Sequence, residues 1–323
     1  MATYLGVDLG ATTIRAVVGD RAGRVVGVDR RPTPRRPADV AITEAVIDAV
    51  REACADAGVD PEAVVAAGIG AVGPLDHDAG VAVDPTNLPS GVGRIPLVGP
   101  LRTRLSTDRT YFHNDATAGA IGERFFHDGG DDLVYLTLST GVGAGVVVDG
   151  HVLSGWNGNA AEVGHVTLDP DDGARACGCG GTGHWEAYCG GANVPGYARD
   201  LHDGESTTLP VDEPDADIDA ADVFDAADGD EFASRVVDRI GRWNALGVAT
   251  VVHAYAPRVV AVGGGVARNN SDRVLGPIRD RLPSLLRVAR TPAVRLTDRD
   301  GDAVVRGALA SAITGGTGDP ADR

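Results

Sequence analysis

The sequence predicts an α/β protein built from two lobes of related design. A buried strand, a turn that carries hydroxyl groups and glycine, and a β-hairpin occur twice, about 130 residues apart, with the turns at residues 8–13 and 139–143. The chain has 323 residues, of which 43% are apolar. This is enough for two cores of about 150 residues each. Chance recurrence of a β-meander is the alternative explanation of the repeat.

Short apolar runs bounded by turn residues predict the strands, and apolar residues at helical spacing predict the helices. The acidic stretch 203–230 is expected to be a solvated loop with one short helix, and the tail beyond residue 313 is expected to fray. The predicted strands are 3–7, 14–18, 24–28, 133–138, 144–148, 151–153 and 259–262, and the predicted helices are 42–57, 231–253 and about 301–313.

The charge of the chain restricts its partners. The formal net charge is −17, and the sequence contains no lysine. An acidic surface disfavours nucleic acid and anionic membranes as partners, and it is typical of proteins adapted to high salt. Without lysine, neither a Walker-type phosphate loop nor a protein-kinase site can be built. A bound nucleotide would therefore be held by backbone amides, hydroxyls and metal.

No apolar run reaches the length of a membrane span, and no charged-then-apolar leader opens the sequence, so a cytoplasmic location is expected. Three of the four cysteines lie between positions 177 and 189, which does not indicate a spread-out disulfide framework.

The two hydroxyl-bearing turns are candidate phosphate-binding segments. In the first, an aspartate that could face Mg²⁺ through water ends a strand, and glycine and threonines follow; in the second, glycines allow close approach to an anion. Ordinary tight turns are the alternative for both. Three glycines after strand 259–262 suit a flat adenine ring, or else a closely packed helix start. The candidate residues are Asp8, Gly10, Thr12, Thr13, Thr140, Gly141, Gly143, Gly263, Gly264 and Gly265.

Asn114 and Asp115 follow a short apolar pair and precede an alanine-rich segment. At a strand end, the carboxylate of Asp115 could accept the proton of a substrate hydroxyl while the Asn114 amide binds a neighbouring group. Asparagine and aspartate are also common helix N-caps, and a cap is the alternative explanation. The two phosphate-like turns favour the general base.

A glycine-rich segment indicates a closed metal site. Cys177, Cys179 and His184, with His165 upstream, supply the four ligands of a tetrahedral structural zinc. Cys189 lies farther along the chain and is a weaker candidate. A pair of reduced structural thiols is the alternative.

In their order along the chain, these motifs resemble the ROK family of sugar kinases and related repressors, which have a two-lobed actin-like (ribonuclease-H-like) ATPase fold. The resemblance runs from Tyr4 to about Ile313. It implies a small lobe of residues 1–113 plus about 303–323, a large lobe of residues 114–302 with a structural zinc loop, and ATP, Mg²⁺ and Zn²⁺ as cofactors. The matching segments are 8–13, 70–74, 114–115, 139–143, 162–165, 177–186 and 263–265.

The resemblance also implies individual roles. Asp115 is similar to the catalytic base of the family, and His165 both ligates zinc and touches sugar there. His184 stands where the family usually has a third cysteine, so a Cys₂His₂ site is expected; Thr13 replaces a lysine often found after the first-turn threonine. The implied sugar-binding residues are Gly73, Asn87, Asn114, Asp115, Glu162, His165 and Glu186.

The expected activity is transfer of the ATP γ-phosphate to the 6-hydroxyl of a hexose, with glucose as the first candidate. Other possible acceptors are N-acetylmannosamine, N-acetylglucosamine and fructose, and ADP or polyphosphate are alternative donors. A sugar-responsive repressor is the rival from another class, and a catalytically inactive sugar-binding protein is disfavoured because Asp115 is present. A homodimer or homotetramer is expected.

Overall fold

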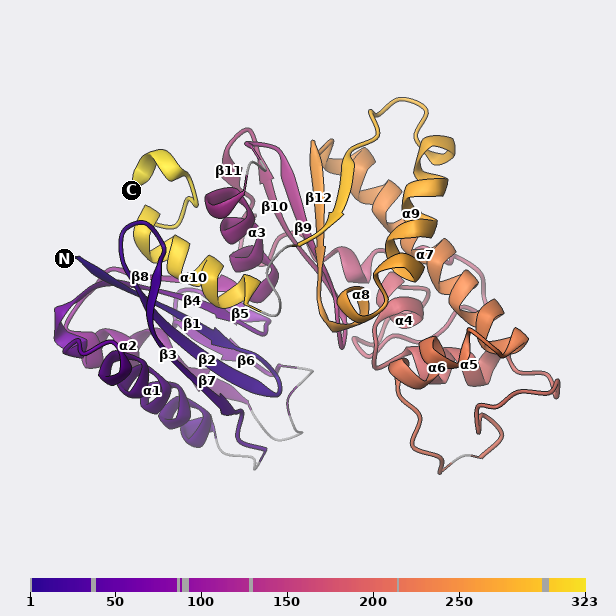
Figure 1. Ribbon diagram of the computed structural model, residues 1–323, viewed down its shortest axis with the longest axis horizontal. Coiled ribbons are helices and arrows are strands. Elements are labelled where there is room, and N and C mark those ends of the chain that lie inside the picture. Colours follow the sequence, from indigo (N-terminus) through magenta and orange to yellow (C-terminus); the bar gives the residue numbers. More distant parts are fainter. Residues whose placement is uncertain are drawn as a thin grey trace. The chain divides into compact units, whose positions relative to one another are not determined.

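A computed structural model of the chain describes residues 2–35, 39–85, 88, 93–127, 130–213, 215–297 and 302–323. Asn87, one of the expected sugar-binding residues, lies outside the described residues. The contacts divide the chain into two compact units (Figure 1). The first unit comprises residues 1–135, 145–161 and 299–323, and the second comprises residues 136–144 and 162–298.

The first unit is built on a five-stranded sheet of order β3-β2-β1-β4-β8. β1 and β2 are antiparallel, as are β2 and β3, whereas β4 runs parallel to β1 and β8 runs parallel to β4. The five strands are β1 Thr3–Leu9, β2 Thr13–Gly19, β3 Val25–Pro32, β4 Val64–Ala71 and β8 Thr110–Asn114.

Helices cover both faces of this sheet. One face carries α1 and α2, and the other carries α10, which lies against β1 and β4 (Figure 1). The α1 face buries a continuous cluster of aliphatic side chains that includes Leu5, Ile14 and Val50. The helices of the unit are α1 Asp39–Asp56, η1 Pro61–Ala63, α2 Val98–Leu105, α3 Asp115–Phe126, α10 Ala303–Thr314 and η3 Pro320–Asp322.

Helix α10 can approach its neighbours only because glycines meet it. A Cβ atom on Gly68 of β4 would lie 1.9 Å from the carbonyl oxygen of Ala308, and one on Gly307 would lie 1.7 Å from the carbonyl oxygen of Ala118 in α3. Both distances are far below van der Waals contact, so no side chain larger than hydrogen fits. The α3–α10 crossing therefore depends on Gly307.

Replacing Gly307 by alanine is expected to destabilise the protein by about 3 kcal/mol or more, because the backbone of α3 or α10 must move to remove the clash. Chemical denaturation of the purified variant measures the change. Gly276→Ala in α9 is the control, since a Cβ there meets nothing within 4 Å. Alanine should stabilise that helix by about 0.5–1 kcal/mol. Equal stabilities of the two variants would show that the crossing tolerates a side chain.

A second five-stranded sheet has the order β11-β10-β9-β12-β13, and a small three-stranded sheet has the order β5-β6-β7. Strands β10 and β11 form an antiparallel hairpin, and β12 pairs with β13 in parallel. The strands are β5 Leu75–Asp76, β6 Val81–Val83, β7 Arg94–Pro96, β9 Leu133–Leu138, β10 Val142–Val148, β11 His151–Val152, β12 Val259–Gly263 and β13 Ala293–Leu296.

The second unit is centred on one long helix, α7. Its N-cap, Asp230, accepts hydrogen bonds from the backbone of Ala233 and from the hydroxyls of Thr207 and Thr208, so the carboxylate joins the helix to the preceding loop. The helix packs against α9 and α4. The helices of the unit are η2 Val163–His165, α4 Trp185–Cys189, α5 Val194–Leu201, α6 Ala220–Ala226, α7 Glu231–Tyr255, α8 Gly265–Asn269 and α9 Ser271–Leu285.

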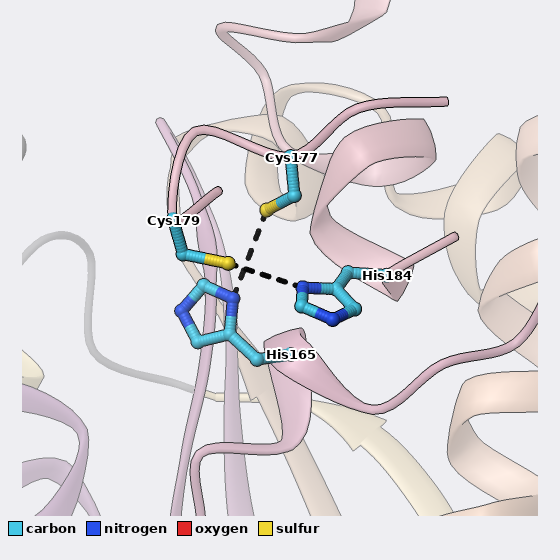
Figure 2. Close-up of side chains that lie close together, drawn as sticks. All are labelled: His165, Cys177, Cys179 and His184. Atoms are coloured by element: carbon cyan, nitrogen blue, oxygen red, sulfur yellow. Dashed lines mark hydrogen bonds between the residues drawn. The ribbon is translucent and has the colours of Figure 1, made fainter. Parts of the chain in front are cut away.

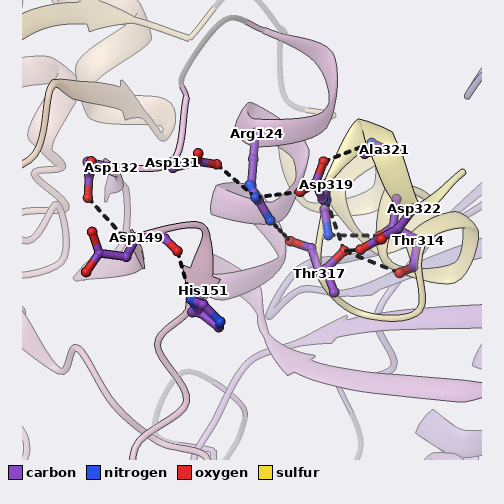
Figure 3. A network of polar contacts seen from close by, with 11 residues as sticks. Arg124, Asp131, Asp132, Asp149, His151, Thr314, Thr317, Asp319, Ala321 and Asp322 are labelled. Carbon is purple, nitrogen blue, oxygen red and sulfur yellow. Dashed lines mark hydrogen bonds and ion pairs between the residues drawn. The ribbon is translucent and has the colours of Figure 1, made fainter.

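The C-terminal tail is anchored, and the expectation that it frays was wrong. The buried guanidinium of Arg124 in α3 donates to the carbonyl oxygen of Thr317 and pairs with the carboxylates of Asp131 and Asp319, each at 2.9 Å (Figure 3). A buried arginine needs such partners, and the tail supplies two of them.

The predicted strands and helices are confirmed within a few residues at each end. The described part of the stretch 203–230 contains the short helix α6 that was expected. Among the described residues, no helix is long and apolar enough to cross a membrane. The predicted division into lobes at residue 113 stays a prediction; contacts group residues 114–135 with the first unit, because α3 packs on α10.

Candidate active site

The first group of candidate residues gathers where three parallel strands end. In the register of β1, β4 and β8, Asp8 lies opposite Gly70, and Ala71 lies opposite Asn114. Because the strands are parallel, their carboxyl ends meet at one edge of the sheet, the usual place for ligands in α/β proteins. Asp8, Gly73, Asn114 and Asp115 are thus brought together from three distant stretches of sequence.

Asp8 is a buried carboxylate in an acidic neighbourhood. Only 5% of Asp8 is exposed. Burial raises its pKa to about 7; the guanidinium of Arg15 opposes this shift, and the carboxylates of Asp115 and Asp302 add to it. A bound divalent cation would favour the ionised form.

Arg15 and Asp302 were not among the sequence candidates. Arg15 lies directly opposite Asp8 in the β1–β2 register, with its Nη1 atom 3.4 Å from Asp8 Oδ2. Asp302 precedes α10, almost 300 residues away from Asp8 in the chain. Sequence reasoning did not single out Arg15, because a period-two strand pattern does not show which cross-strand partner a residue has.

The turn between β1 and β2 is held by its own backbone and by Thr33. The Gly10 amide donates to the carbonyl oxygen of Thr13 at 3.1 Å, and the Thr33 hydroxyl donates to the carbonyl oxygen of Gly10 at 2.8 Å. The Gly10 amide therefore closes the turn, while Thr12 is exposed. The Thr12 hydroxyl is therefore one donor that this turn can offer to an anion.

Asn114 takes the capping role that the sequence left open, and the role of Asp115 as general base stays a prediction. Asn114 is the N-cap of α3, and its Oδ1 atom accepts from the amide of Ala116 at 2.9 Å. The Asp115 carboxylate accepts from the same amide at 2.7 Å. A Cβ atom on Gly73 would lie 3.3 Å from Asn114 Nδ2, so Gly73 borders the amide. The cap fixes the two side chains at the strand end.

The second turn lies in the second unit and contacts another candidate. The Glu186 carboxylate accepts from the amide of Val142 at 2.8 Å, and a Cβ atom on Gly141 would lie 2.3 Å from Glu186 Oε2. Gly141 is therefore required where the carboxylate meets the turn. Thr140 is exposed beside it.

The three glycines after β12 lie next to this turn. Gly264 has φ of +91°, and a Cβ atom there would lie 2.2 Å from the carbonyl oxygen of Leu138. A Cβ on Gly265 would lie 3.9 Å from the hydroxyl oxygen of Ser139. The predicted adenine and phosphate segments of the second unit are thus neighbours.

Glu162, His165 and Glu186 also meet within the second unit. The Nε2 atom of His165 is 3.9 Å from Glu162 Oε2. Burial raises the pKa of Glu162, His165 lowers it, and Glu186 raises it. The arrangement presents two carboxylates that can accept hydrogen bonds from ligand hydroxyls and an imidazole whose Nε2–H can donate one when Nδ1 is engaged by the cluster.

Four metal-ligating side chains converge beside this group (Figure 2). Ligand atoms of His165, Cys177, Cys179 and His184 all lie within 4.8 Å of one another. Cys177 Sγ is 3.8 Å from His165 Nδ1, and Cys179 Sγ is 3.2 Å from His184 Nδ1. A turn closed by the Gly180 amide on the carbonyl oxygen of Cys177 brings the two thiols to one side.

The four side chains fit a zinc ion by number, chemistry and spacing. Two thiols and two imidazoles are a common structural set, and no fifth ligand atom is needed. His165 turns Nδ1 to the cluster and Nε2 to Glu162, and such a carboxylate orients a ligating histidine. Cys189 lies outside the cluster: its buried thiol is 3.6 Å from the carbonyl oxygen of Ile240.

Two units, each with a turn that bears hydroxyls and glycine after a buried strand, define an α/β protein of the two-lobed actin-like class. The chain belongs to the ROK family, whose model matches residues 4–314.

Curated relatives match nearly the whole chain. A glucokinase from Pyrobaculum calidifontis is 38% identical over 315 residues, which cover 97% of this chain and 95% of the relative. An N-acetyl-D-glucosamine kinase from Pectobacterium carotovorum is 32% identical over 94% of this chain and 97% of its own length.

Solved structures agree. A ROK hexokinase from Thermus thermophilus superposes with a TM-score of 0.81 at 33% identity, covering 96% of this chain and 97% of that one. A ROK glucokinase from Streptomyces griseus, solved with glucose and AMPPNP, superposes with a TM-score of 0.75 at 31% identity over 96% and 99% of the two chains.

Proposed function

We propose that this protein is a sugar kinase that transfers the γ-phosphoryl group of ATP to the 6-hydroxyl of a hexose, with glucose as the preferred acceptor. The observation that carries the proposal is the position of Asp115, at the carboxyl edge of the sheet beside Asn114 and in the electrostatic neighbourhood of Asp8. Its relatives named glucokinase support the choice of glucose.

Asp115 acts as the general base. It takes the proton of the sugar hydroxyl as the oxygen forms a bond to the γ-phosphorus, and the bond from phosphorus to the β,γ-bridging oxygen breaks and leaves ADP. A bound Mg²⁺ would neutralise charge on the phosphates, and Asp8 is the carboxylate assigned to it. The residues assigned to the phosphates and adenine are Gly10, Thr12, Thr13, Thr140, Gly141, Gly143, Gly263, Gly264 and Gly265.

The sugar hydroxyls are assigned to two groups of residues described above, one that includes Asn114 and one that includes Glu162. Asn114 binds one hydroxyl beside the base, with the backbone of Gly73 next to it. Other hydroxyls are assigned to Glu162, His165 and Glu186. The sugar-binding role of Asn87 stays a prediction. Since Glu186 also accepts from the amide of Val142, sugar binding and the second phosphate turn share one carboxylate.

We assign the cluster of His165, Cys177, Cys179 and His184 to a structural zinc ion. A closed four-ligand site shapes a loop and does not activate water. Because His165 is both a ligand of the cluster and a neighbour of Glu162, the ion would fix the orientation of an imidazole assigned to the sugar.

Formation of sugar phosphate tests the activity across glucose, fructose, N-acetylglucosamine and N-acetylmannosamine, with ATP, ADP and polyphosphate as donors. With ATP, a coupled assay of ADP release measures the same reaction. Glucose with ATP should give the highest kcat/KM. Preference for an N-acetylhexosamine would favour the alternative acceptor class, which the relatives named N-acetyl-D-glucosamine kinase support. Absence of sugar-dependent turnover with every donor would contradict the proposal and favour a repressor-like relative.

Arg15 should tune this activity through Asp8. Removing the cation in Arg15→Gln raises the pKa of Asp8 further above about 7, so less of the carboxylate is ionised at neutral pH. The activity that depends on ionised Asp8 is lost as pH falls through this pKa. We expect the acid limb of kcat/KM for ATP to move up by about one pH unit.

The pH profile of Arg15→Gln is compared with those of Arg15→Lys, which keeps the charge, and Arg102→Gln, an exposed arginine on α2. Both controls should retain the wild-type limb. If the acid limb of kcat/KM for ATP did not move in Arg15→Gln, the charge of Arg15 would not influence the activity through the pKa of Asp8.

We further propose that the enzyme is a homodimer or homotetramer in the cytoplasm, with no nucleic-acid or membrane partner. The net charge of −17 supports the last point. Light scattering of the purified protein tests the oligomeric state.

A further inference from the structure

Trp156 differs from the other two tryptophans of the chain. The indole N–H of Trp185 donates to Asn244 at 3.0 Å, and that of Trp243 donates to the hydroxyl oxygen of Tyr197 at 2.9 Å. Trp156 is 98% exposed. An indole that is fully exposed to water gains no free energy from burial of its large apolar surface. A ligand that covered the indole would supply this gain.

The loop that carries Trp156, residues 154–161, is firmly attached within the first unit. The Asn159 side chain accepts from the amide of Leu75 at 3.1 Å and donates to the carbonyl oxygen of the same residue at 3.0 Å. The ring nitrogen Nε2 of His77 lies 3.2 Å from the carbonyl oxygen of Gly158, and a Cβ atom on Gly158 would lie 2.1 Å from the His77 ring. Two contacts, both at residues just after Trp156 in the chain, thus fix the loop that carries the exposed indole.

The anchor of this loop lies beside the proposed acceptor residues. Leu75 is two residues beyond Gly73, and an added Cβ on Gly73 would lie 3.3 Å from the Asn114 amide nitrogen and 3.5 Å from the Leu75 amide. Asn114 precedes the proposed base. At its other end, the loop leads directly into Glu162. Both ends of the Trp156 loop therefore connect to residues assigned to the sugar.

We propose that Trp156 is a sugar-binding residue whose indole covers one face of the acceptor hexose. A pyranose ring presents C–H groups on its faces and hydroxyls at its edge; the carboxylates and amides above suit the edge, and an aromatic ring suits a face. The inference rests on the proposed function. The acceptor is favoured over adenine because the loop is anchored beside Asn114, which is assigned to the sugar.

Steady-state kinetics test the role. Trp156→Ala should raise KM for glucose about tenfold, with KM for ATP unchanged. Trp156→Phe should restore most of the affinity, because it keeps an aromatic face. Val288→Ala is the matched control, since Val288 is 91% exposed and far from these residues in the chain. An unchanged KM for glucose in Trp156→Ala, or a raised KM for ATP in its place, would overturn the proposal.

Acrylamide quenching of tryptophan fluorescence gives a readout that does not need turnover. Saturating glucose alone should protect the exposed indole of the wild type, and AMPPNP alone should not. In Trp156→Phe the glucose-protected component should be absent, and the half-buried Trp243 should give the same quenching with or without glucose. An indole that stays equally quenchable in saturating glucose would contradict the inference. If the wild type shows no sugar-dependent ADP release but glucose still protects the indole, the proposed activity fails and the sugar contact stands.

Discussion

Replacing Asp115 by asparagine is expected to lower kcat for sugar phosphorylation by about 10²–10⁴-fold, with KM for glucose nearly unchanged. The amide keeps the shape of the side chain and can still accept from the Ala116 amide, as Asp115 Oδ1 does at 2.7 Å. What it loses is the ability to take a proton from the sugar hydroxyl. The loss should therefore appear in the chemical step and not in binding.

The coupled ADP-release assay measures this change, and isothermal titration with glucose confirms that binding survives. Asp78→Asn is the control, because Asp78 is an exposed aspartate of the same unit. Its kinetics should match the wild type. If Asp115→Asn retained the kcat of the wild type, another group would have to be the general base. The catalytic site could then no longer be assigned to the carboxyl edge of the first sheet.

Replacing Cys177 by serine should remove the metal and lower the melting temperature by about 10 °C, since a structural zinc site contributes several kcal/mol of folding free energy. The cluster loses one of its four ligands, and a serine hydroxyl is a poor replacement for a thiolate. KM for glucose should rise as well, because the metal would no longer fix the His165 ring in the orientation that turns Nε2 toward Glu162.

Mass spectrometry of the native protein measures bound metal, and a thermal scan measures stability. Cys54→Ala is the control: Cys54 is a buried cysteine of α1 in the first unit, so this variant should keep about one zinc ion per chain. Stoichiometric metal and wild-type stability in Cys177→Ser would show that these four side chains are not a zinc site.

Local features of the sequence were enough to predict the strands and helices. Strand 133–138 was predicted as it occurs in β9, and the hairpin that follows was recognised from its turn residues, because alternation and turn chemistry act between neighbours in the chain. The Cys-Gly-Cys segment with nearby histidines likewise indicated a metal cluster, since all four side chains lie within 20 positions of one another. Adaptation to high salt, inferred from the charge, stays a prediction.

Only the tertiary structure decided which residues of different elements lie in contact with one another. The pairing of Arg15 with Asp8 depends on strand register, and the approach of Asp302 to the same carboxylate depends on how α10 packs against β1 and β4. The attachment of the Trp156 loop to Leu75 and of the tail to Arg124 depends on packing in the same way. Propensity and pattern act over a few residues, whereas the contacts of Asp302, of the Trp156 loop and of the tail join positions more than eighty residues apart and are selected by burial and close packing.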